Sequence, residues 1–207
     1  MMSLTTGLTE GTTALEMGDL ARITVDQYEE LARLGTLADP GVELVNGLLV
    51  RKTTKSPRHS ATVMVIEEVI RAVTPEGWHV RVEQPVRLPE HDEPEPDLAI
   101  VRGNAIDYLE RHPGPADVAL VVEVEVAAAS LRIDRGDKLR AYSRGGIPAY
   151  WIVNLIERRV EVYGDPVPEG YASLVTHEPS SDIVLTIAGQ ERGRVVAGDL
   201  LPEPRTP

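Results

Sequence analysis

Two stretches in the first part of the chain have the hydrophobic spacing of amphipathic helices. In the first, apolar residues recur on one face from Val25 onward, and Thr24 and Gln27 stand three residues apart, as in a capping box. In the second, Ser56 can cap the helix and Pro57 suits its first turn. The side chains that share one face of this second helix are His59, Val63, Ile66 and Ile70. We therefore predict helices that begin at Val25 and at Pro57.

Between these two helices the sequence predicts a tight hairpin. The dipeptide Asn46-Gly47 separates the apolar runs 42–45 and 48–50. Asn-Gly is favoured where both central residues of a turn need positive φ, as in the shortest β-hairpins.

The rest of the chain alternates strand-like and helical patterns. Residues 119–126 form an apolar run that only Glu123 and Glu125 interrupt, which is typical of a buried strand, and residues 131–144 have helical spacing. The other predicted strands span residues 78–88, 98–101, 149–155, 159–163, 171–176 and 182–187. These elements predict an α/β (α+β) fold, with one domain at residues 21–200, a loose leader at 1–20 and a loose tail at 201–207.

The composition narrows the classes of function. The chain has no cysteine, which excludes disulfides, thiolate nucleophiles and cysteine-ligated zinc, and fits a reducing, cytoplasmic setting. The sequence has no apolar run that could cross a bilayer, so we expect no membrane partner. It also lacks nucleotide-binding glycine motifs, a G-x-S-x-G elbow and H-E-x-x-H.

The net charge of −12 argues against non-specific DNA binding, which needs a basic surface. Two local basic clusters could nevertheless contact phosphates. They are Arg51, Lys52, Lys55 and Arg58, and then Arg132, Arg135, Lys138, Arg140 and Arg144. The alternative interpretation of both clusters is ordinary solvated surface charge.

Candidate chemistry lies in the polar exceptions to the apolar strands. Asp97 stands between an acidic, Pro-rich loop and the strand 98–101, where a plain turn aspartate is the alternative. Glu123 and Glu125 are two residues apart and point to the same face of their strand. Two buried carboxylates on one face repel each other, and a multivalent cation would relieve that cost. The alternative is an edge strand with one solvated face.

Two further groups of residues are candidates of another kind. Asp134, Lys138 and Tyr142 form one stripe of the helix that follows the glutamate strand, so this helix could deliver Lys138 toward the glutamates. A surface ion pair is the alternative. His59 lies on the apolar face of its helix, where a hydrogen-bonded core histidine is the alternative to a catalytic one.

Several short motifs follow one another along the chain in a recognisable order. They are Glu43-Leu44-Val45-Asn46-Gly47, Ser56-Pro57-Arg58-His59, Pro96-Asp97-Leu98, Val121-Val122-Glu123-Val124, Asp134-Arg135-Gly136-Asp137-Lys138-Leu139, Ala141-Tyr142, Gly146-Ile147-Pro148 and Tyr150-Trp151-Ile152-Val153. Their order and spacing, across roughly residues 22–200, resemble the Uma-type family of restriction endonuclease-like proteins. That family belongs to the PD-(D/E)XK nuclease superfamily.

This resemblance implies a restriction-endonuclease-like mixed β-sheet flanked by helices, with a carboxylate cluster at one end. It implies that Asp97 of the PD motif and Glu123 of the (D/E)XK strand are catalytic metal ligands, and that Lys138 is the catalytic lysine, placed on the next helix. Glu43 matches a further acidic position and could also bind metal. The segment 126–130 is about one residue longer than the usual turn, and Glu125 replaces an aliphatic residue. Which of Glu123 and Glu125 is the ligand therefore stays open.

The resemblance and the carboxylates together predict a metal-dependent endonuclease that hydrolyses phosphodiester bonds, with DNA as the partner. Mg²⁺ or Mn²⁺ is the expected cofactor, because both prefer carboxylate and water oxygens. The resemblance also implies a homodimer. The alternative, which the acidic balance favours, is a catalytically silent binding or regulatory module that keeps the nuclease fold. An acidic protein-interaction domain is a third hypothesis.

Overall fold

A six-stranded mixed sheet forms the centre of the computed structural model, which describes residues 20–37, 41–52 and 54–203. The strands lie in the order β3-β4-β5-β6-β7-β8, and only the central pair β5 and β6 runs parallel. Their bounds are β3 Trp78–Val82, β4 Leu98–Arg102, β5 Val118–Glu125, β6 Ala149–Asn154, β7 Arg159–Val167 and β8 Gly170–His177. Because β5 lies inside the sheet and every residue of it is buried, the edge-strand interpretation of its glutamates is wrong.

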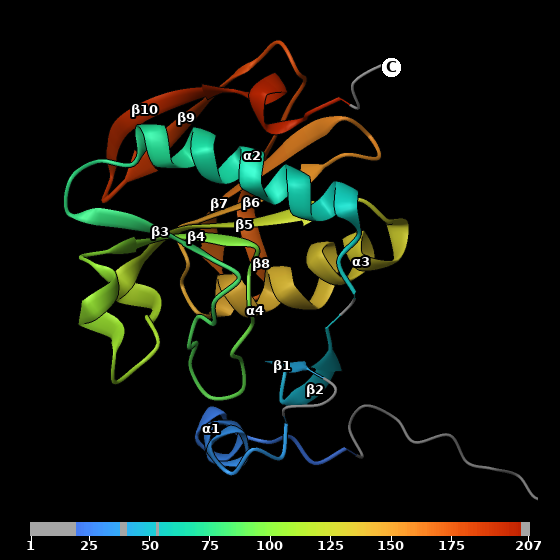
Figure 1. Cartoon of the computed structure of the whole chain (residues 1–207), viewed down its shortest axis with the longest axis vertical. Helices are drawn as coiled ribbons and strands as arrows, with labels where there is room; N and C mark the ends of the chain where they lie inside the picture. The colour runs from blue at the N-terminus through green and yellow to red at the C-terminus, as the bar shows by residue number, and fades with distance from the viewer. Residues whose placement is uncertain (1–19, 38–40, 53, 204–207) are drawn as a thin grey trace, which may run out of the picture.

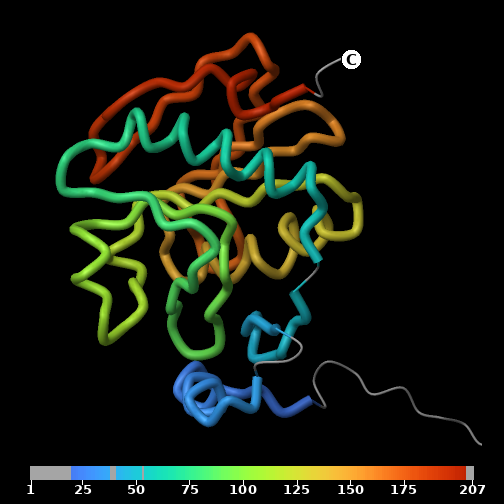
Figure 2. Tube along the Cα trace, in the orientation of Figure 1, coloured from blue at the N-terminus to red at the C-terminus, as the bar shows by residue number. Residues whose placement is uncertain are grey.

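Different elements cover the two faces of this sheet (Figures 1 and 2). Helix α2 (Pro57–Val73) and the hairpin of β9 (Asp182–Ile187) and β10 (Gln190–Val196) cover one face. The other face packs against a continuous helical stretch, made of α3 (Ala128–Ile133), a π-helical turn (Asp134–Lys138) and α4 (Leu139–Arg144). Single 3₁₀ turns occur at Ala105–Tyr108, Pro115–Asp117 and Ala197–Leu200. The predicted mixed sheet flanked by helices is therefore confirmed.

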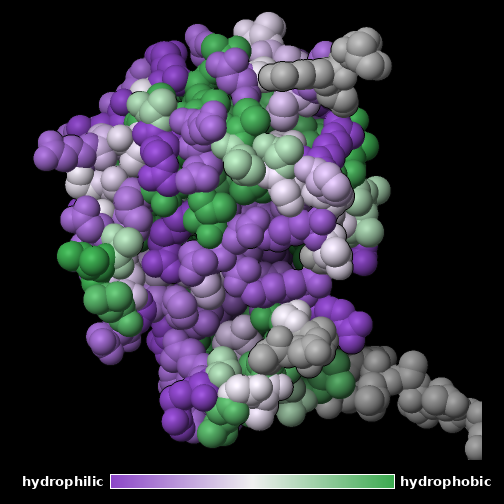
Figure 3. Space-filling model, in the orientation of Figure 1, coloured by the Kyte–Doolittle hydropathy of each residue, from purple (hydrophilic) through white to green (hydrophobic). Residues whose placement is uncertain are grey.

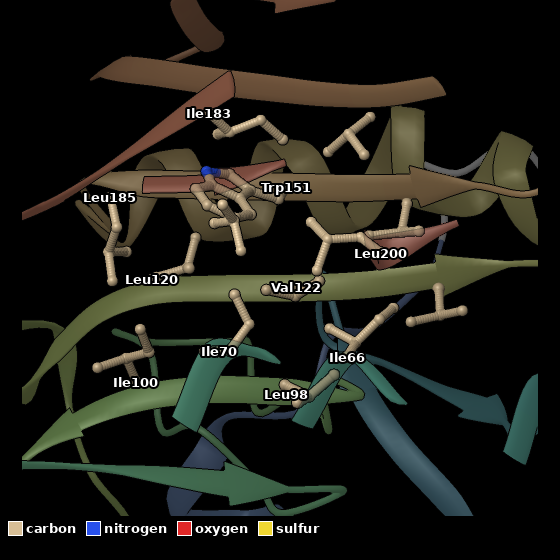
Figure 4. Packing of buried hydrophobic residues seen from close by; sticks show 14 of the residues in the cluster. Ile66, Ile70, Leu98, Ile100, Leu120, Val122, Trp151, Ile183, Leu185 and Leu200 are labelled. Carbon is tan, nitrogen blue, oxygen red and sulfur yellow. The ribbon is translucent and has the colours of Figure 1, made fainter. Parts of the chain in front are cut away.

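The larger hydrophobic core fills the space between the sheet and α2 (Figure 4). Trp151 of β6 lies at its centre and is 1% exposed. The residues around it include Ile66, Ile70, Leu98, Ile100, Leu120, Val122, Ile183, Leu185 and Leu200. Since the chain has no Phe, aliphatic side chains supply most of this core.

Local sequence explains how the helices begin. The Thr24 side chain accepts a hydrogen bond from the Gln27 backbone, and the Gln27 side chain accepts one from the Thr24 backbone, so the predicted capping box is confirmed. The Ser56 hydroxyl accepts a hydrogen bond from the backbone N–H of His59, with Pro57 in the first helical position. Both caps satisfy backbone donors that the first helical turn would leave without partners.

The N-terminal elements form a small unit at one end of the sheet (Figure 1). Helix α1 spans Val25–Arg33, and the predicted hairpin is formed by β1 (Val42–Val45) and β2 (Leu48–Arg51). Asn46 and Gly47 have φ values of 54° and 73°, the positive values that such a turn requires. Leu44 of β1 pairs with Glu93 in an isolated antiparallel bridge, and this bridge attaches the hairpin to the loop before β4.

The structure differs from the sequence predictions in four places. The strand predicted at 78–88 ends at Val82, because Glu83 takes a positive φ of 53° and turns the chain out of the sheet. The helix predicted at 131–144 begins at Ala128 and contains the π turn. Strand β10 was not predicted. Leu201, assigned to the loose tail, is buried in the core, while the predicted leader at 1–20 and the last four residues lie almost entirely outside the described residues.

A hollow of about 750 Å³ lies between α1 and the loops around residues 87–93 and 108–115. None of the candidate catalytic residues lines it. Glu93 borders this hollow, and burial together with the nearby Glu29 carboxylate raises the pKa of Glu93 to about 8. This hollow is therefore distinct from the candidate site, but it contains a carboxyl that is protonated at neutral pH.

The protonation of Glu93 predicts a pH-dependent stability. Its folded-state pKa of about 8 lies above its ordinary value of 4.5, so the favourable contribution of the bound proton is lost as pH rises through that range. Glu93→Gln mimics the protonated form and should be more stable than wild type by about 1–2 kcal/mol at pH 9, with little difference at pH 5. Urea unfolding at the two pH values measures this, with Glu110→Gln, an exposed residue that lines the same hollow, as the control. The same difference at both pH values would contradict the assignment.

Candidate active site

Strand register brings Asp97 next to the end of β5. Strands β4 and β5 are antiparallel with Leu98 opposite Val122, so the residue before Leu98 meets the residue after Val122, which is Glu123. The Asp97 backbone N–H donates to Glu123 Oε2 at 3.3 Å, and Asp97 Oδ2 accepts the Val124 N–H at 2.8 Å. Asp97 is therefore held rigidly between two strands, with its other oxygen, Oδ1, turned toward α2.

Glu123 lies at the centre of the hydrogen-bond network of the site. It is 3% exposed, and its Oε1 accepts hydrogen bonds from Lys138 Nζ at 3.0 Å and from the Tyr142 hydroxyl at 2.8 Å. Both donors belong to the helical stretch that follows β5. The stripe of Asp134, Lys138 and Tyr142 that the sequence indicates does face the glutamate strand, so the surface ion-pair alternative is wrong.

The π turn places Lys138 among three carboxylates. Its Nζ lies 3.0 Å from Glu123 Oε1, 3.2 Å from Glu43 Oε1 and 3.8 Å from Asp134 Oδ1. Lys138 itself is only 8% exposed. A π turn inserts one extra residue into a helix, so it changes the face on which the following side chains lie, and such turns are frequent at functional sites. Here it directs a lysine to the carboxylates of two different strands.

Glu43 reaches the site from the small N-terminal unit. It lies on β1 and is 7% exposed, and its Oε2 accepts the backbone N–H of Glu95 at 2.9 Å. The loop that contains Glu95 leads directly into Asp97. The hairpin and the loop thus form one wall of the site, opposite the helical stretch.

Glu125 points into the same region but has different partners. Its carboxylate accepts a hydrogen bond from the Ser130 hydroxyl and lies beside the carboxyl group of Asp134. Neither Lys138 nor Asp97 makes a hydrogen bond or ion pair with Glu125 among the described residues. Of the two glutamates that the sequence left open, Glu123 is therefore the one that contacts Lys138 and the Asp97 backbone.

His59 lies on the inner face of α2, where it contacts Asp97. Its Nε2 is 3.0 Å from Asp97 Oδ1, and its Nδ1 is 3.1 Å from the Val124 carbonyl oxygen. Hydrogen bonding to Asp97 raises the pKa of His59. The helix face predicted for His59 is thus confirmed, and the side chain joins α2 to both β4 and β5.

Burial of several carboxylates controls the electrostatics of the site. Burial raises the pKa of Glu123 and of Asp134 well above their ordinary values, and neighbouring carboxylates add to both shifts. Burial alone would lower the pKa of Lys138, but Glu123, Glu43 and Asp134 outweigh it and raise the pKa well above its ordinary value. Burial and the adjacent Glu123 also keep the Tyr142 hydroxyl protonated. The site thus combines one permanent ammonium with an excess of carboxyl groups.

A cavity of about 320 Å³ joins these residues to solvent. Its lining includes Glu43, Asp97, Glu123, Glu125, His59, Asp134 and Lys138, together with Arg51, Lys52 and Lys55. The potential metal ligands suit Mg²⁺ or Mn²⁺, because they are carboxylate oxygens beside a space that can hold water. The residues present therefore fit the divalent cation that the resemblance implies.

Two residues beside the candidate site were not predicted from the sequence. Glu83 follows β3 and lies close to Asp97, but the sequence pattern placed it in the interior of a strand. Pro85, two residues later, is the signal that could have ended that strand, because proline has no N–H for a sheet ladder. Ser130, which bonds Glu125, lies in α3, within the segment 126–130 that is longer than the usual turn, and nothing in the sequence indicated its partner.

Comparison with known proteins places the chain in a family. The sequence matches Uma2, a family described as "Putative restriction endonuclease", over residues 25–194. The chain is a member of the Uma2 family. Its fold is similar to a solved structure described as "a putative nuclease belonging to DUF820" from Anabaena variabilis ATCC 29413, with a TM-score of 0.62 and 18% sequence identity. That match covers 86% of this chain and 97% of the other, and no curated protein matches the sequence.

Uma2 membership confirms the resemblance found in the sequence, and the structural match confirms the nuclease-like fold. At 18% identity the solved structure is evidence for the fold alone. Within the described ranges, no helix is both long and apolar enough to span a membrane.

Proposed function

We propose that this Uma2 chain is a divalent-cation-dependent endonuclease that hydrolyses phosphodiester bonds of DNA. The observation that supports this most is the position of Lys138, whose Nζ lies within 3.2 Å of carboxylates from both β1 and β5. Lysine and acidic residues from separate segments meet at one cavity that is open to solvent. A purely structural ion pair would not need three carboxylates around one lysine.

Asp97 and Glu123 are the residues we assign to hold the cation, with Glu43 as a further ligand. Asp97 Oδ2 and Glu123 Oε2 each accept one backbone N–H, which orients both carboxylates before any cation binds. When bound, Mg²⁺ or Mn²⁺ would polarise a phosphoryl oxygen and lower the pKa of a bound water. Preorganised ligands reduce the free energy that the protein must spend on ordering the site.

The role we assign to Lys138 is that of a cation and hydrogen-bond donor. Its raised pKa keeps the amine protonated at neutral pH, so it cannot accept a proton from water. A fixed ammonium in a buried site stabilises negative charge that develops on the phosphate in the transition state, an effect that mutagenesis puts at about 10²–10³ in rate for one donor. The Tyr142 hydroxyl holds Glu123 in place and is not itself a proton acceptor.

DNA would approach over the basic residues at the mouth of the cavity. Arg51, Lys52 and Lys55 line it and are exposed, although Lys52 and Lys55 also pair with Glu95 and Glu83. Hydrophilic residues cover the middle of the face seen in Figure 3. Because the whole chain has a net charge of −12, we expect weak, strongly salt-dependent binding that depends on this local patch. The homodimer and the cytoplasmic location stay predictions.

A plasmid-nicking assay with Mn²⁺ tests the proposal. Wild type should convert supercoiled plasmid to the nicked form. In Asp97→Ala and Lys138→Ala, the rate of nicking should fall by at least about 100-fold. Asp137→Asn and Arg140→Gln serve as controls, because they form an exposed ion pair on the same helical stretch and should leave the rate unchanged.

Equal rates in all five proteins would contradict the proposal. Calorimetry then tests the alternative hypothesis of a catalytically silent module, which the net negative charge of the chain favours. Intact folding with no Mg²⁺ or Mn²⁺ binding at millimolar concentration would support the silent module.

A further inference from the structure

A second group of potential metal ligands includes Asp97 but not Lys138 or its carboxylate partners. His59, Glu83 and Asp97 each present one ligand atom, and these three atoms lie within 4.8 Å of one another. They come from α2, from the residue after β3 and from the residue before β4. The group shares only Asp97 with the Asp97, Glu123 and Glu43 set assigned above.

The hydrogen bonds of His59 indicate which ring nitrogen could bind a metal in place of its hydrogen bond to Asp97. The Val124 carbonyl can only accept, so Nδ1, 3.1 Å away, must be the N–H donor. In the neutral ring this leaves a lone pair on Nε2, which points at Asp97 Oδ1 only 3.0 Å away. Two acceptors at this distance repel unless a positive charge lies between or on them. Metal-binding histidines commonly donate their second nitrogen to a backbone carbonyl in this way.

The position of Glu83 is maintained at a conformational cost. Its φ of 53° is unfavourable for a residue with a Cβ, and its backbone N–H donates to the Asp97 carbonyl at 3.0 Å. This bond fixes the Glu83 backbone beside Asp97, and one carboxylate oxygen of each residue lies within 4.8 Å of the other. Two acidic side chains are thereby close together beside the cavity that Asp97 lines.

A positive group already lies between these two acids. Lys55 Nζ is 2.6 Å from Glu83 Oε1 and 4.0 Å from Asp97 Oδ1. Its side chain is 36% exposed and sits on the segment before α2, so it can swing into solvent without unfolding any element. The carboxylates of Glu83 and Asp97 therefore attract cations, and a metal ion could displace their present counter-ion, Lys55.

We propose that His59, Glu83 and Asp97 form a second divalent-cation site, in which Asp97 bridges to the first. One nitrogen and two carboxylate donors, with water completing the octahedron, suit Mn²⁺ better than Mg²⁺, because imidazole is a poor ligand for the harder ion. Binding displaces Lys55 from Glu83. The proposal rests on the proposed function only through the shared Asp97.

Electron paramagnetic resonance of bound Mn²⁺ tests the second site without any measurement of activity. Wild type should bind two Mn²⁺ ions and show ¹⁴N coupling from an imidazole. His59→Gln should lose that coupling, and both His59→Gln and Glu83→Gln should bind one ion. Lys55→Gln should bind the nitrogen-coupled ion about tenfold more tightly, because its competitor is gone.

Matched controls are His79→Gln, a histidine that contacts the Gly103 carbonyl away from the cavity, and Glu68→Gln, an exposed residue of α2. Both should keep two ions and the coupling, and thermal melts would show which variants fold. A single ion without nitrogen coupling in wild type would overturn the proposal, and His59 would then be a protonated partner of Asp97 only. If nicking fails but the nitrogen-coupled ion persists in Glu123→Gln, the nuclease proposal is wrong and the second site stands.

Discussion

Lys138→Met should lower the stability of the cation-free protein by about 3–5 kcal/mol at pH 8. Among the residues that the structure describes, Lys138 is the one ammonium within 4 Å of Glu43, Glu123 and Asp134, and all three carboxylates are buried. Its removal leaves these charges without compensation in a region of low dielectric. The pKa values of Glu123 and Asp134, which burial already raises, then rise further, and the stability lost through these two carboxylates increases as pH rises.

The loss should therefore shrink toward pH 5, where Glu123 and Asp134 take up protons. Urea unfolding at pH 5 and pH 8, in the presence of a chelator, measures both values. Lys52→Met is the matched control, because Lys52 pairs with Glu95 at a more exposed position and should cost no more than about 1 kcal/mol. A loss of the same size at both pH values would show that Lys138 stabilises the fold by packing alone.

Glu123→Gln should have the opposite combination of effects, with activity lost and stability retained. We expect the rate of DNA cleavage to fall by about 10²–10³, since the variant loses a proposed metal ligand. The change in stability should stay within about 1 kcal/mol. The first reason is that burial raises the pKa of Glu123 well above its ordinary value, so a neutral amide at this position costs little. The second is that Lys138 still has Glu43 and Asp134 as counter-ions in the variant.

The nicking assay and urea unfolding of the same preparation check this pair of outcomes. Glu161→Gln is the control, since Glu161 is equally buried but bonds Arg135 and Tyr163 away from the cavity. It should keep activity and lose stability. Unchanged cleavage in Glu123→Gln would remove Glu123 from the proposed ligands and direct attention to Glu125.

Elements that depend on neighbours in the chain were predicted well. The Thr24 capping box, the Ser56 cap and the Asn46-Gly47 turn all formed as expected. In each case the decisive hydrogen bond or backbone angle involves residues no more than four apart. The apolar run of β5 was also sufficient, because a strand buried on both faces needs no partner to be recognised.

Elements that depend on distant partners were predicted less well. The strand expected at 78–88 ended early because Glu83 takes a positive φ of 53°. The hydrogen bond that holds Glu83 in this position joins it to Asp97, a residue far along the chain. The π turn could not be predicted, since it differs from an α-helix by one inserted residue and has the same composition. Strand β10 is mostly polar and exposed, so it had no apolar alternation to indicate it.

By itself, the sequence determined the family, the central strand and the identity of the candidate residues, because ordered motifs and hydrophobic periodicity are properties of the chain alone. Only the tertiary structure decided that Glu123 meets Lys138 and that Glu125 turns to Ser130 and Asp134. Both glutamates lie on the same face of one strand, so local pattern cannot distinguish them. The register of β4 on β5 and the extra residue of the π turn distinguish them, and both arise from packing between segments far apart in the chain.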